Sequence, residues 1–288
     1  MPDAIPIAPQ ELQRRVAGPE SDDANYEENG RLAGESILAL LPEDWSWEGK
    51  RVLDFGCGPG RVLRHLARAA PEAELHGCDT HEPSIRWLQE RSTDRILAFV
   101  NSEEPPLDRP DGFFDLIYAV SVFTHLTASW SRWLLELHRL LRPDGLLIST
   151  YAGEVDHQQY LVFDAPWDED RIGMNVLAPA APWDAGGPAV FHSRWWLEAH
   201  WGRAFDFLRM TPDGFGGLTQ GALLLQKRAV RLDPENLERP EPGEPRELAA
   251  ARHNVRQLSH ELAQRQREID YLRWRLAEAE REKEEVTR

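Results

Sequence analysis

The sequence predicts an α/β protein with a doubly wound, mostly parallel sheet of seven strands. Short apolar runs of strand length alternate with amphipathic stretches of helix length through residues 51–151, which is the pattern of βα units in a parallel sheet. The first apolar run leads directly into a glycine-rich turn and a helical pattern. Two further strand-like runs, 205–210 and 219–227, predict a C-terminal antiparallel hairpin.

The N-terminal segment, residues 1–30, is polar and contains prolines. We expect it to be irregular, apart from a short turn or helix around residues 11–16. A helical stretch follows at 31–41 and ends at Pro42, because proline cannot continue a helix.

Residues 51–61, RVLDFGCGPGR, carry the most informative pattern. The first five residues form an apolar run typical of a buried parallel strand. The next five, Gly56-Cys57-Gly58-Pro59-Gly60, cannot continue it, because glycine tolerates positive φ and proline has no N–H. Helical spacing begins at Arg61. This arrangement exposes backbone N–H groups at a helix N-terminus and lets a ligand approach the main chain closely.

Two features separate this turn from the dinucleotide-binding fingerprint. Its glycine spacing is G-x-G-x-G rather than G-x-G-x-x-G, and Asp54 precedes the first glycine by two residues. A carboxylate there repels a pyrophosphate, whereas it can accept hydrogen bonds from a ligand ammonium or from the N–H groups of the loop. DFGCGPGR resembles motif I of the class I methyltransferases that use S-adenosylmethionine, and the resemblance covers nearly all of residues 30–230.

That resemblance implies a Rossmann-like fold with S-adenosylmethionine as its cofactor. The methionine part would be held by Asp54, Gly56, Cys57, Gly58 and Gly60. The N-terminal segment would fold over the cofactor as a lid, with Tyr26 and Arg31 as candidate residues. A surface helix packed on the sheet edge explains Tyr26 and Arg31 about equally well.

The second and third strand-like runs, 74–78 and 96–100, are both followed by polar residues. Asp79, followed by Thr80, lies nineteen residues beyond Gly60, where a carboxylate can accept hydrogen bonds from both ribose hydroxyls. Capping of the next helix is the alternative role for Asp79 or Thr80. The resemblance places Asn101 and Ser102 at the adenine edge, although an Asx turn explains Asn101 almost equally well.

The fourth strand-like run, FDLIYAV at 114–120, resembles the next motif of the family. Ser121 and His125 follow it at the carboxyl edge of the sheet, where open α/β sheets bind ligands. His125 titrates near neutral pH and can act as a general base toward an acceptor hydroxyl. Capping or packing of a helix is the more frequent role of such a histidine.

The stretch 129–141 carries an apolar helical stripe that includes Trp130 and Trp133, which predicts a core-facing helix. A turn at Pro143-Asp144-Gly145, where the family usually has Pro-Gly-Gly, leads to a fifth strand at 146–151. Residues 152–190 do not continue the alternation of strand-like and helix-like stretches, and they contain tryptophans, acidic residues, prolines and glycines. We expect this insertion to cover the acceptor side of the site. Tryptophan and carboxylate side chains suit sugar rings or cationic amines, and equally a small satellite core.

The C-terminal part predicts a linker and a coiled coil. Residues 231–244 are charged and proline-rich, with few means of packing, and apolar residues recur every seven positions in 245–288. The a positions are Leu248, Val255, Leu262, Ile269 and Leu276, and the d positions are Ala251, Leu258, Leu272, Ala279 and Val286, interrupted at Arg265 and Lys283.

In a parallel dimer the g and e′ positions bring together Glu247–Arg252, Glu268–Arg273 and Arg275–Glu280. None of the six such pairs is like-charged, which favours a parallel homodimer. A helix that folds back on the body or seeks a different partner is the alternative.

Composition restricts the class of partner and the compartment. The net charge is −16, yet residues 246–288 hold ten basic and nine acidic residues, so the acidity lies in the rest of the chain. An acidic body disfavours nucleic acid and anionic lipid surfaces as partners. The sequence has no run of membrane-spanning length, no basic, apolar start typical of a signal peptide, no metal-ligand cluster and only two cysteines. We therefore expect a cytoplasmic protein without a bound metal.

Together these observations predict an S-adenosylmethionine-dependent methyltransferase that O-methylates a hydroxyl of a sugar, a glycan or a small metabolite. Two alternatives remain open. One is N-methylation of a small amine, which needs no general base. The other is a catalytically silent cofactor-fold domain that serves as a coiled-coil assembly platform. The sequence does not name the acceptor.

Overall fold

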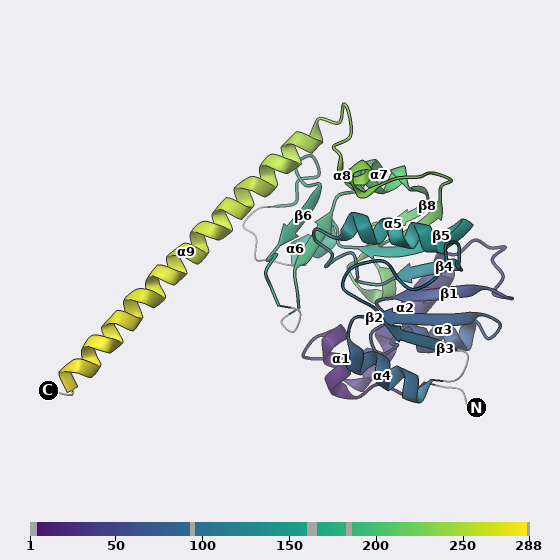
Figure 1. The fold of residues 1–288 in the computed structure, drawn as a ribbon, viewed down its shortest axis with the longest axis horizontal. Helices are drawn as coiled ribbons and strands as arrows, with labels where there is room; N and C mark the ends of the chain where they lie inside the picture. Colours follow the sequence, from purple (N-terminus) through teal and green to yellow (C-terminus); the bar gives the residue numbers. More distant parts are fainter. Residues whose placement is uncertain (1–4, 93–95, 160–165, 183–185, 287–288) are drawn as a thin grey trace.

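The computed structural model describes residues 5–92, 96–159, 166–182 and 186–286 (Figure 1). Its main sheet has seven strands in the order β3-β2-β1-β4-β5-β9-β8. The strands are β1 (Arg51–Phe55), β2 (Glu74–Asp79), β3 (Ile96–Val100), β4 (Phe114–Ala119), β5 (Leu141–Tyr151), β8 (Phe205–Thr211) and β9 (Gly221–Lys227). Neighbours from β3 to β5 are parallel, whereas β9 is antiparallel to both β5 and β8. The predicted fold class is confirmed.

Helices cover both faces of this sheet. The α-helices of the described chain are α1 (Gln10–Ala17), α2 (Asp23–Leu40), α3 (Leu63–Ala69), α4 (Glu82–Arg91), α5 (Trp130–Leu140), α6 (Glu154–Gln159), α7 (Arg194–His200), α8 (Pro234–Glu238) and α9 (Arg246–Val286). One core lies between the sheet and α2, α3 and α4, and the other lies between the sheet and α5 and α7. Alternate residues of a strand enter opposite cores, as Val52 and Leu53 do, because side chains alternate across a strand.

The N-terminal helix α2 is longer than the sequence predicts. It begins at Asp23 rather than at residue 31 because Asp22 caps it, with the side chain accepting from the Asn25 N–H at 2.7 Å. Acceptance of one otherwise unpaired N–H stabilises a helix start. The early start carries Tyr26 into a small core with Ala8 and Leu12. The helix near residues 11–16 is confirmed as α1.

The insertion at 152–190 contains regular structure that the sequence pattern does not predict. A short helix, α6, follows β5, and a separate two-stranded sheet joins β6 (Met174–Leu177) to β7 (Ala189–His192). The Val190 N–H donates to the Thr124 carbonyl at 2.8 Å. This bond ties the insertion to the segment that follows β4, at the carboxyl edge of the main sheet.

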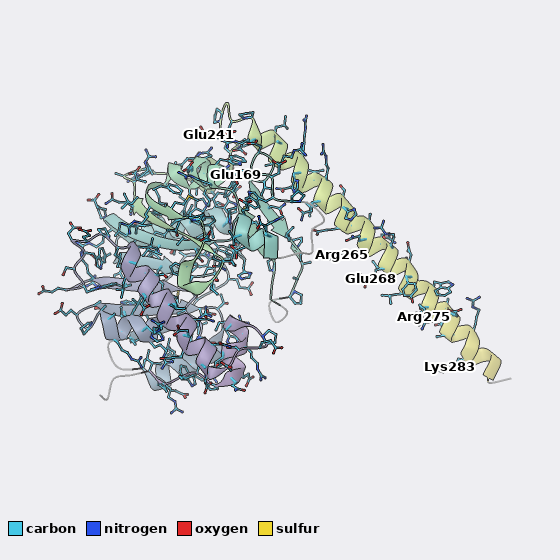
Figure 2. All side chains as sticks on the ribbon, turned by 180° about the vertical axis from the view of Figure 1, so that it is seen from behind. Glu169, Glu241, Arg265, Glu268, Arg275 and Lys283 are labelled. Atoms are coloured by element: carbon cyan, nitrogen blue, oxygen red, sulfur yellow. The ribbon has the colours of Figure 1, made fainter. Side chains whose placement is uncertain are left out.

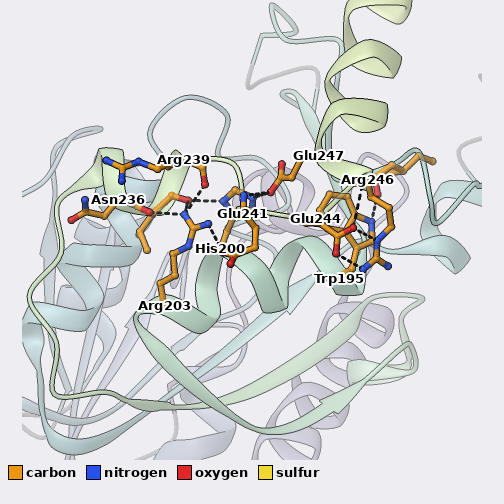
Figure 3. Close-up of polar contacts among 11 residues, drawn as sticks. Trp195, His200, Arg203, Asn236, Arg239, Glu241, Glu244, Arg246 and Glu247 are labelled. Atoms are coloured by element: carbon orange, nitrogen blue, oxygen red, sulfur yellow. Dashed lines mark hydrogen bonds and ion pairs between the residues drawn. The ribbon is translucent and has the colours of Figure 1, made fainter.

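The expectation of a poorly packed linker at 231–244 is wrong. This segment contains α8, with Leu237 completely buried. Its carbonyl groups accept from side chains of the body: the Leu237 carbonyl accepts from His200 at 2.5 Å, and those of Asn236 and Arg239 accept from Arg203 (Figure 3). The charged and proline-rich composition of this segment gives no indication that one leucine is buried or that several backbone carbonyl groups accept hydrogen bonds from the body.

The last helix, α9, projects from the body as one continuous rod of 41 residues (Figure 1). Its first turns dock on the body: Ala250 is buried, Arg246 lies over the Trp195 ring, and Asn254 and Gln257 bond to Asn175 of β6. The rest of the helix extends away from the body (Figure 2). Among the described helices, none has the length and apolar character that crossing a bilayer requires.

Candidate active site

A cleft of about 760 Å³ opens at the carboxyl edge of the main sheet. It lies where β1 has β2 on one side and β4 on the other, which is the point where open α/β sheets bind ligands. Nine of the eleven residues predicted from the sequence line it, namely Asp54, Gly56, Cys57, Asp79, Thr80, Asn101, Ser102, Ser121 and His125. One cleft thus brings these nine residues together.

Gly58 and Gly60 are the two predicted residues outside the cleft lining. Each has positive φ, 51° and 81°. A Cβ added to Gly58 would lie 2.8 Å from Val16, and one added to Gly60 would lie 2.9 Å from Leu88. They shape the turn and admit neighbouring helices, because only glycine adopts this backbone without strain in so little space.

The loop N–H groups are occupied within the protein, which corrects the expectation that they are exposed to a ligand. Those of Gly56 and Cys57 donate to the Cys78 carbonyl at 2.8 and 2.9 Å, and that of Gly58 donates to the Asp79 carboxylate at 2.9 Å. The regular helix starts only at Leu63. Gly56 lines the cleft, and an added Cβ there would overlap the Val122 side chain, so packing of the loop requires glycine at this position.

Asp54 is a buried carboxyl group on the floor of the cleft, with 3% of its surface exposed. Burial raises its pKa to about 8, since a charged form loses its solvation. The Tyr118 hydroxyl and the Arg61 guanidinium oppose this rise, whereas the charge of Asp79 adds to it. The Tyr118 hydroxyl has no hydrogen-bond partner in the structure, and it lowers the pKa of Asp54 by less than burial raises it. A cation bound beside Asp54 would stabilise the carboxylate.

Asp79 is held rigidly at the end of β2. One carboxylate oxygen accepts from the Gly58 N–H at 2.9 Å and the other accepts from the His81 N–H at 2.8 Å. Asp79 is therefore not the residue that caps α4, because that position belongs to His81. Each carboxylate oxygen accepts more than one hydrogen bond, so both oxygens keep capacity for a ligand.

Asn101 presents an unsatisfied acceptor at the end of the cleft formed by β3. Its side-chain N–H donates to the Ser102 carbonyl at 2.7 Å, while its Oδ1 is buried and has no hydrogen-bond partner. A buried polar atom without a partner is costly. A ligand amine such as that of adenine would satisfy it.

The opposite end of the cleft contains Ser121 and His125. Ser121 has φ of 58°, its N–H donates to Thr150 at 2.7 Å, and its hydroxyl donates to Gln220 at 2.9 Å. His125 Nδ1 lies 2.7 Å from the Pro188 carbonyl, and burial lowers the pKa of its ring below 6.5. Because a carbonyl only accepts, Nδ1 carries the proton, and the neutral ring has its lone pair on Nε2.

Sequence reasoning missed three kinds of residue. Arg61 lines the cleft, whereas the sequence pattern marked it only as the start of helical spacing after the glycine loop. Trp133 was assigned to the core, and it is both buried and part of the cleft wall. Arg15 and Val16 reach the cleft from α1, and no local sequence signal marks them because their position depends on tertiary packing.

The N-terminal segment does cover part of the cleft, but through other residues than those predicted. Val16 lies against Gly58, and Arg15 lines the cleft. Tyr26 is buried, and Arg31 is exposed at the surface, where it pairs with Glu28 and Glu35. Neither residue lines the cleft, which agrees with the second of the two roles left open by the sequence, a helix packed against the sheet. Among the described residues, no group of three or more His, Cys, Asp or Glu side chains is placed to hold a metal ion.

Comparison with known proteins agrees with this geometry. Residues 53–147 match the model of a methyltransferase domain family. A fatty-acid O-methyltransferase of Mycolicibacterium smegmatis is 34% identical over 122 residues, which is 41% of this chain and 44% of that protein. A trans-aconitate 2-methyltransferase of Rhodopseudomonas palustris is 26% identical over 183 residues, covering 59% and 68% of the two chains. The chain thus spans less than half the length of the first of these relatives.

Solved structures share the fold at low sequence identity. One is a protein of Pyrococcus horikoshii, with a TM-score of 0.54, 17% identity and coverage of 75% of this chain and 98% of that one. Another is a magnesium protoporphyrin IX methyltransferase of Synechocystis, solved with bound S-adenosylhomocysteine, with a TM-score of 0.50, 17% identity and coverage of 76% and 94%. Residues 53–147 therefore match a methyltransferase domain, and the fold that contains them is one that a methyltransferase with bound S-adenosylhomocysteine shares.

Proposed function

We propose that the chain binds S-adenosylmethionine in the cleft and catalyses transfer of its methyl group to a hydroxyl of an uncharged sugar or small metabolite. The main support for this proposal is that a single cleft contains all the residues concerned. Asp54, Asp79 and Asn101 line it at the ends of β1, β2 and β3, and His125 lines it beyond β4. A cofactor can therefore lie along the first three residues and meet an acceptor near the fourth.

The residues present fit the cofactor at three points. Asp54 is a buried carboxyl group suited to an ammonium, Asp79 retains acceptor capacity for ribose hydroxyls, and Asn101 Oδ1 is a buried acceptor without a partner. When bound, the sulfonium supplies an activated methyl group. The protein's contribution is mainly to align donor and acceptor and to accept one proton.

His125 is placed to accept that proton. Its Nδ1–H is bonded to the Pro188 carbonyl, so Nε2 is the basic atom of the neutral ring. An acceptor hydroxyl beside Nε2 would lose its proton to His125 as its oxygen gains the methyl group, and the electron pair of the broken S–CH3 bond would remain on the sulfur of the departing S-adenosylhomocysteine. Burial keeps the ring neutral at pH 7, which is the state that a base requires.

The charge distribution favours an uncharged acceptor. The only arginine or lysine side chains in the described lining of the cleft are Arg15 and Arg61, and both lie at the cofactor end, near His81 and Asp54. The insertion at 152–190 contains one arginine, Arg171, which is exposed and paired with Asp168. Fatty acid and trans-aconitate, in the names of two relatives, carry carboxylates that a cation would bind.

Transfer of a labelled methyl group tests this function. The full chain is incubated with S-adenosylmethionine labelled in its methyl group and with three acceptor panels: neutral saccharides and alcohols, amines, and carboxylic acids. We expect label in the first panel. Label only in the amines or only in the acids would overturn the hydroxyl assignment, and no binding of the cofactor at all would overturn the enzyme function.

We also propose that the chain acts in the cytoplasm as a homodimer joined through α9. The two cysteines, Cys57 and Cys78, are free and buried, which suits a reducing compartment. Several apolar a and d side chains of α9 are exposed, including Leu262 at 68% and Leu276 at 62%. Exposed apolar side chains in a row of this kind mark an interface.

A further inference from the structure

The part of the cleft that contains His125 is lined by the segment between β6 and β7. Pro179 and Pro188 belong to this lining. Pro179 lies just beyond the end of β6, and Pro188 directly precedes β7. The Pro188 carbonyl lies 2.7 Å from His125 Nδ1. The position of this carbonyl therefore depends on how the two strands are held.

The strand β7 is bonded to the body beyond its first residue. The N–H groups of Val190 and His192 donate to carbonyls of the body at 2.8 Å. Both residues follow Ala189, which is paired with Leu177 of β6. The end of β7 next to Pro188 thus lies outside these two bonds and is paired with β6. The placement of Pro188 consequently depends on β6 as well as on the body.

The other edge of β6 is covered by α9 (Figure 1). In the described chain β6 has a strand on one side only, which is β7, and an open strand edge leaves backbone groups unpaired. The Asn254 side chain donates to the Met174 carbonyl at 2.8 Å. About one turn further along α9, the Gln257 side chain donates to the Val176 carbonyl at 3.4 Å. Two amides of α9 therefore take the place of a third strand.

Asn175 joins β6 to the same two amides. It is 2% exposed, and its Nδ2 donates to Asn254 Oδ1 at 2.9 Å and to Gln257 Oε1 at 2.6 Å. Both N–H groups of its amide are thus used, and loss of the acceptors would leave a buried donor unpaired, which is costly. Gly173 adds close packing, since an added Cβ would lie 3.2 Å from Ala250 of α9. Hydrogen bonds and packing together fix β6 on α9.

We propose that Asn175 is a positioning residue for His125. Through its bonds to Asn254 and Gln257 it fixes β6 on α9. The two strands then hold the Pro188 carbonyl where it keeps the proton of His125 on Nδ1 and the lone pair on Nε2. The docked turns of α9 thereby support the base, although no described residue of these turns lines the cleft. This inference rests on the proposed function, because it concerns the base of that reaction.

Two measurements on the full chain test this role. Histidine labelled with ¹⁵N in its ring reports by NMR which nitrogen of His125 carries the proton, and His125→Gln assigns the signal. In the unaltered protein we expect the proton on Nδ1. Asn175→Ala should give a mixture of the two neutral forms, because the hydrogen bond to Nδ1 sets the tautomer. Calorimetry should show that affinity for S-adenosylhomocysteine changes less than about twofold, because the cofactor contacts are remote from Asn175.

A second variant covers the case in which Asn175→Ala does not fold. Asn254→Ala combined with Gln257→Ala removes the same bonds from the α9 side, and alanine favours the helix. This variant should give the same change of tautomer. Gln266→Ala is the matched control, because Gln266 is an amide beyond the docked turns that bonds to Asp270 of the same helix. It should leave the His125 signal unchanged.

Turnover separates a positioning role from a general loss of structure. With an acceptor found in the labelled-methyl panels, kcat should fall by about 10-fold in both variants while cofactor affinity is kept, because a misplaced base slows only the chemical step. An unchanged tautomer in both variants, or equal losses of kcat and cofactor affinity, overturns the inference. No label transfer by the unaltered protein overturns the proposed function instead. The tautomer still tests the positioning in that case, because the ring signal requires no acceptor.

Discussion

At the residue scale, Asp54 makes cofactor binding depend on pH. Its pKa of about 8 in the free protein means that the carboxyl group is mostly protonated at pH 7, whereas an ammonium bound beside it favours the carboxylate. Binding should therefore release close to one proton at pH 7, and affinity should rise with pH, by up to about tenfold per pH unit, until the pH passes about 8.

Calorimetry of S-adenosylhomocysteine binding in buffers of different ionisation enthalpy measures this proton. The observed enthalpy should vary with the buffer for the unaltered protein and be constant for Asp54→Asn, which has no proton to release. A buffer-independent enthalpy in the unaltered protein would show that Asp54 is already ionised.

His125 makes a separate prediction about turnover. His125→Gln keeps a donor for the Pro188 carbonyl and removes the base. We expect kcat to fall by about 100-fold or more, with little change in S-adenosylhomocysteine affinity. In the unaltered protein, kcat should be constant above pH 7 and fall on acidification through the His125 pKa, which lies below 6.5, because protonation removes the base. An unchanged kcat in the variant would indicate an acceptor that needs no base.

The sequence predicted which polar residues lie at the strand ends of the cleft, but it did not predict the groups that bond to them or bury them. Asp54 lies near the end of an apolar run, and Asp79, Asn101 and His125 follow such runs, so their meeting at one sheet edge followed from the parallel topology. The Pro188 carbonyl that orients His125 lies 63 residues away, inside an insertion without periodicity. The solvation that shifts the pKa of Asp54 likewise depends on the finished fold.

At the element scale, the contact of α2 with the glycine loop explains Gly30. Alanine in a helix interior normally stabilises relative to glycine by about 1 kcal/mol. At Gly30 the added Cβ would meet the Arg61 carbonyl oxygen at 2.5 Å, and backbone cannot move aside cheaply. We expect Gly30→Ala to lower the free energy of unfolding by about 1–3 kcal/mol.

Gly34→Ala is the comparison on the same helix. Its Cβ would meet the His65 Cβ at 3.3 Å, so the strain is smaller and the helix propensity of alanine offsets part of it. Urea denaturation of the two variants should place Gly30→Ala well below Gly34→Ala. Equal stabilities would mean that α2 is free to shift away from the loop.

Element boundaries were predictable where one local feature sets them. The glycine turn and Pro42 stop their elements for reasons visible in the sequence. The early start of α2 depends on the Asp22 cap together with burial of Tyr26, and the packing of 231–244 depends on carbonyl acceptors that any sequence possesses. Composition alone does not reveal such contacts.

At the scale of the whole molecule, α9 presents two separate faces. Ala250, Asn254 and Gln257 dock on the body, whereas the exposed seam that contains Leu262 and Ile269 lies roughly 110° round the helix from them. Docking therefore leaves the seam free. It also occupies Glu247, which binds His200 (Figure 3), so the predicted pair with Arg252 of a second copy loses its acid. The dimer interface that we propose would therefore lie in the distal part of α9.

Self-association through that distal helix is tested at Ile269, an a position that is 44% exposed. Ile269→Asp buries a charge in the seam of a dimer and should weaken dimerisation by about 100-fold or more. Sedimentation should then give the mass of one chain, 33.0 kDa, instead of two. Trp274→Asp is the control, since Trp274 is similarly exposed at 51% but stands outside the a and d positions, and it should leave the mass unchanged.

Charged residues of α9 predict that the two helices of the proposed dimer run in the same direction. These residues are Glu268, Arg273 and Arg275, of which Glu268 and Arg275 are labelled in Figure 2. Only a parallel arrangement in register brings Glu268 to Arg273 of the other chain. Glu268→Arg should weaken the dimer, and adding Arg273→Glu should restore it. Loss of dimer in the double variant would exclude the parallel register. In an antiparallel pair the two bodies would instead lie at opposite ends of the coiled coil.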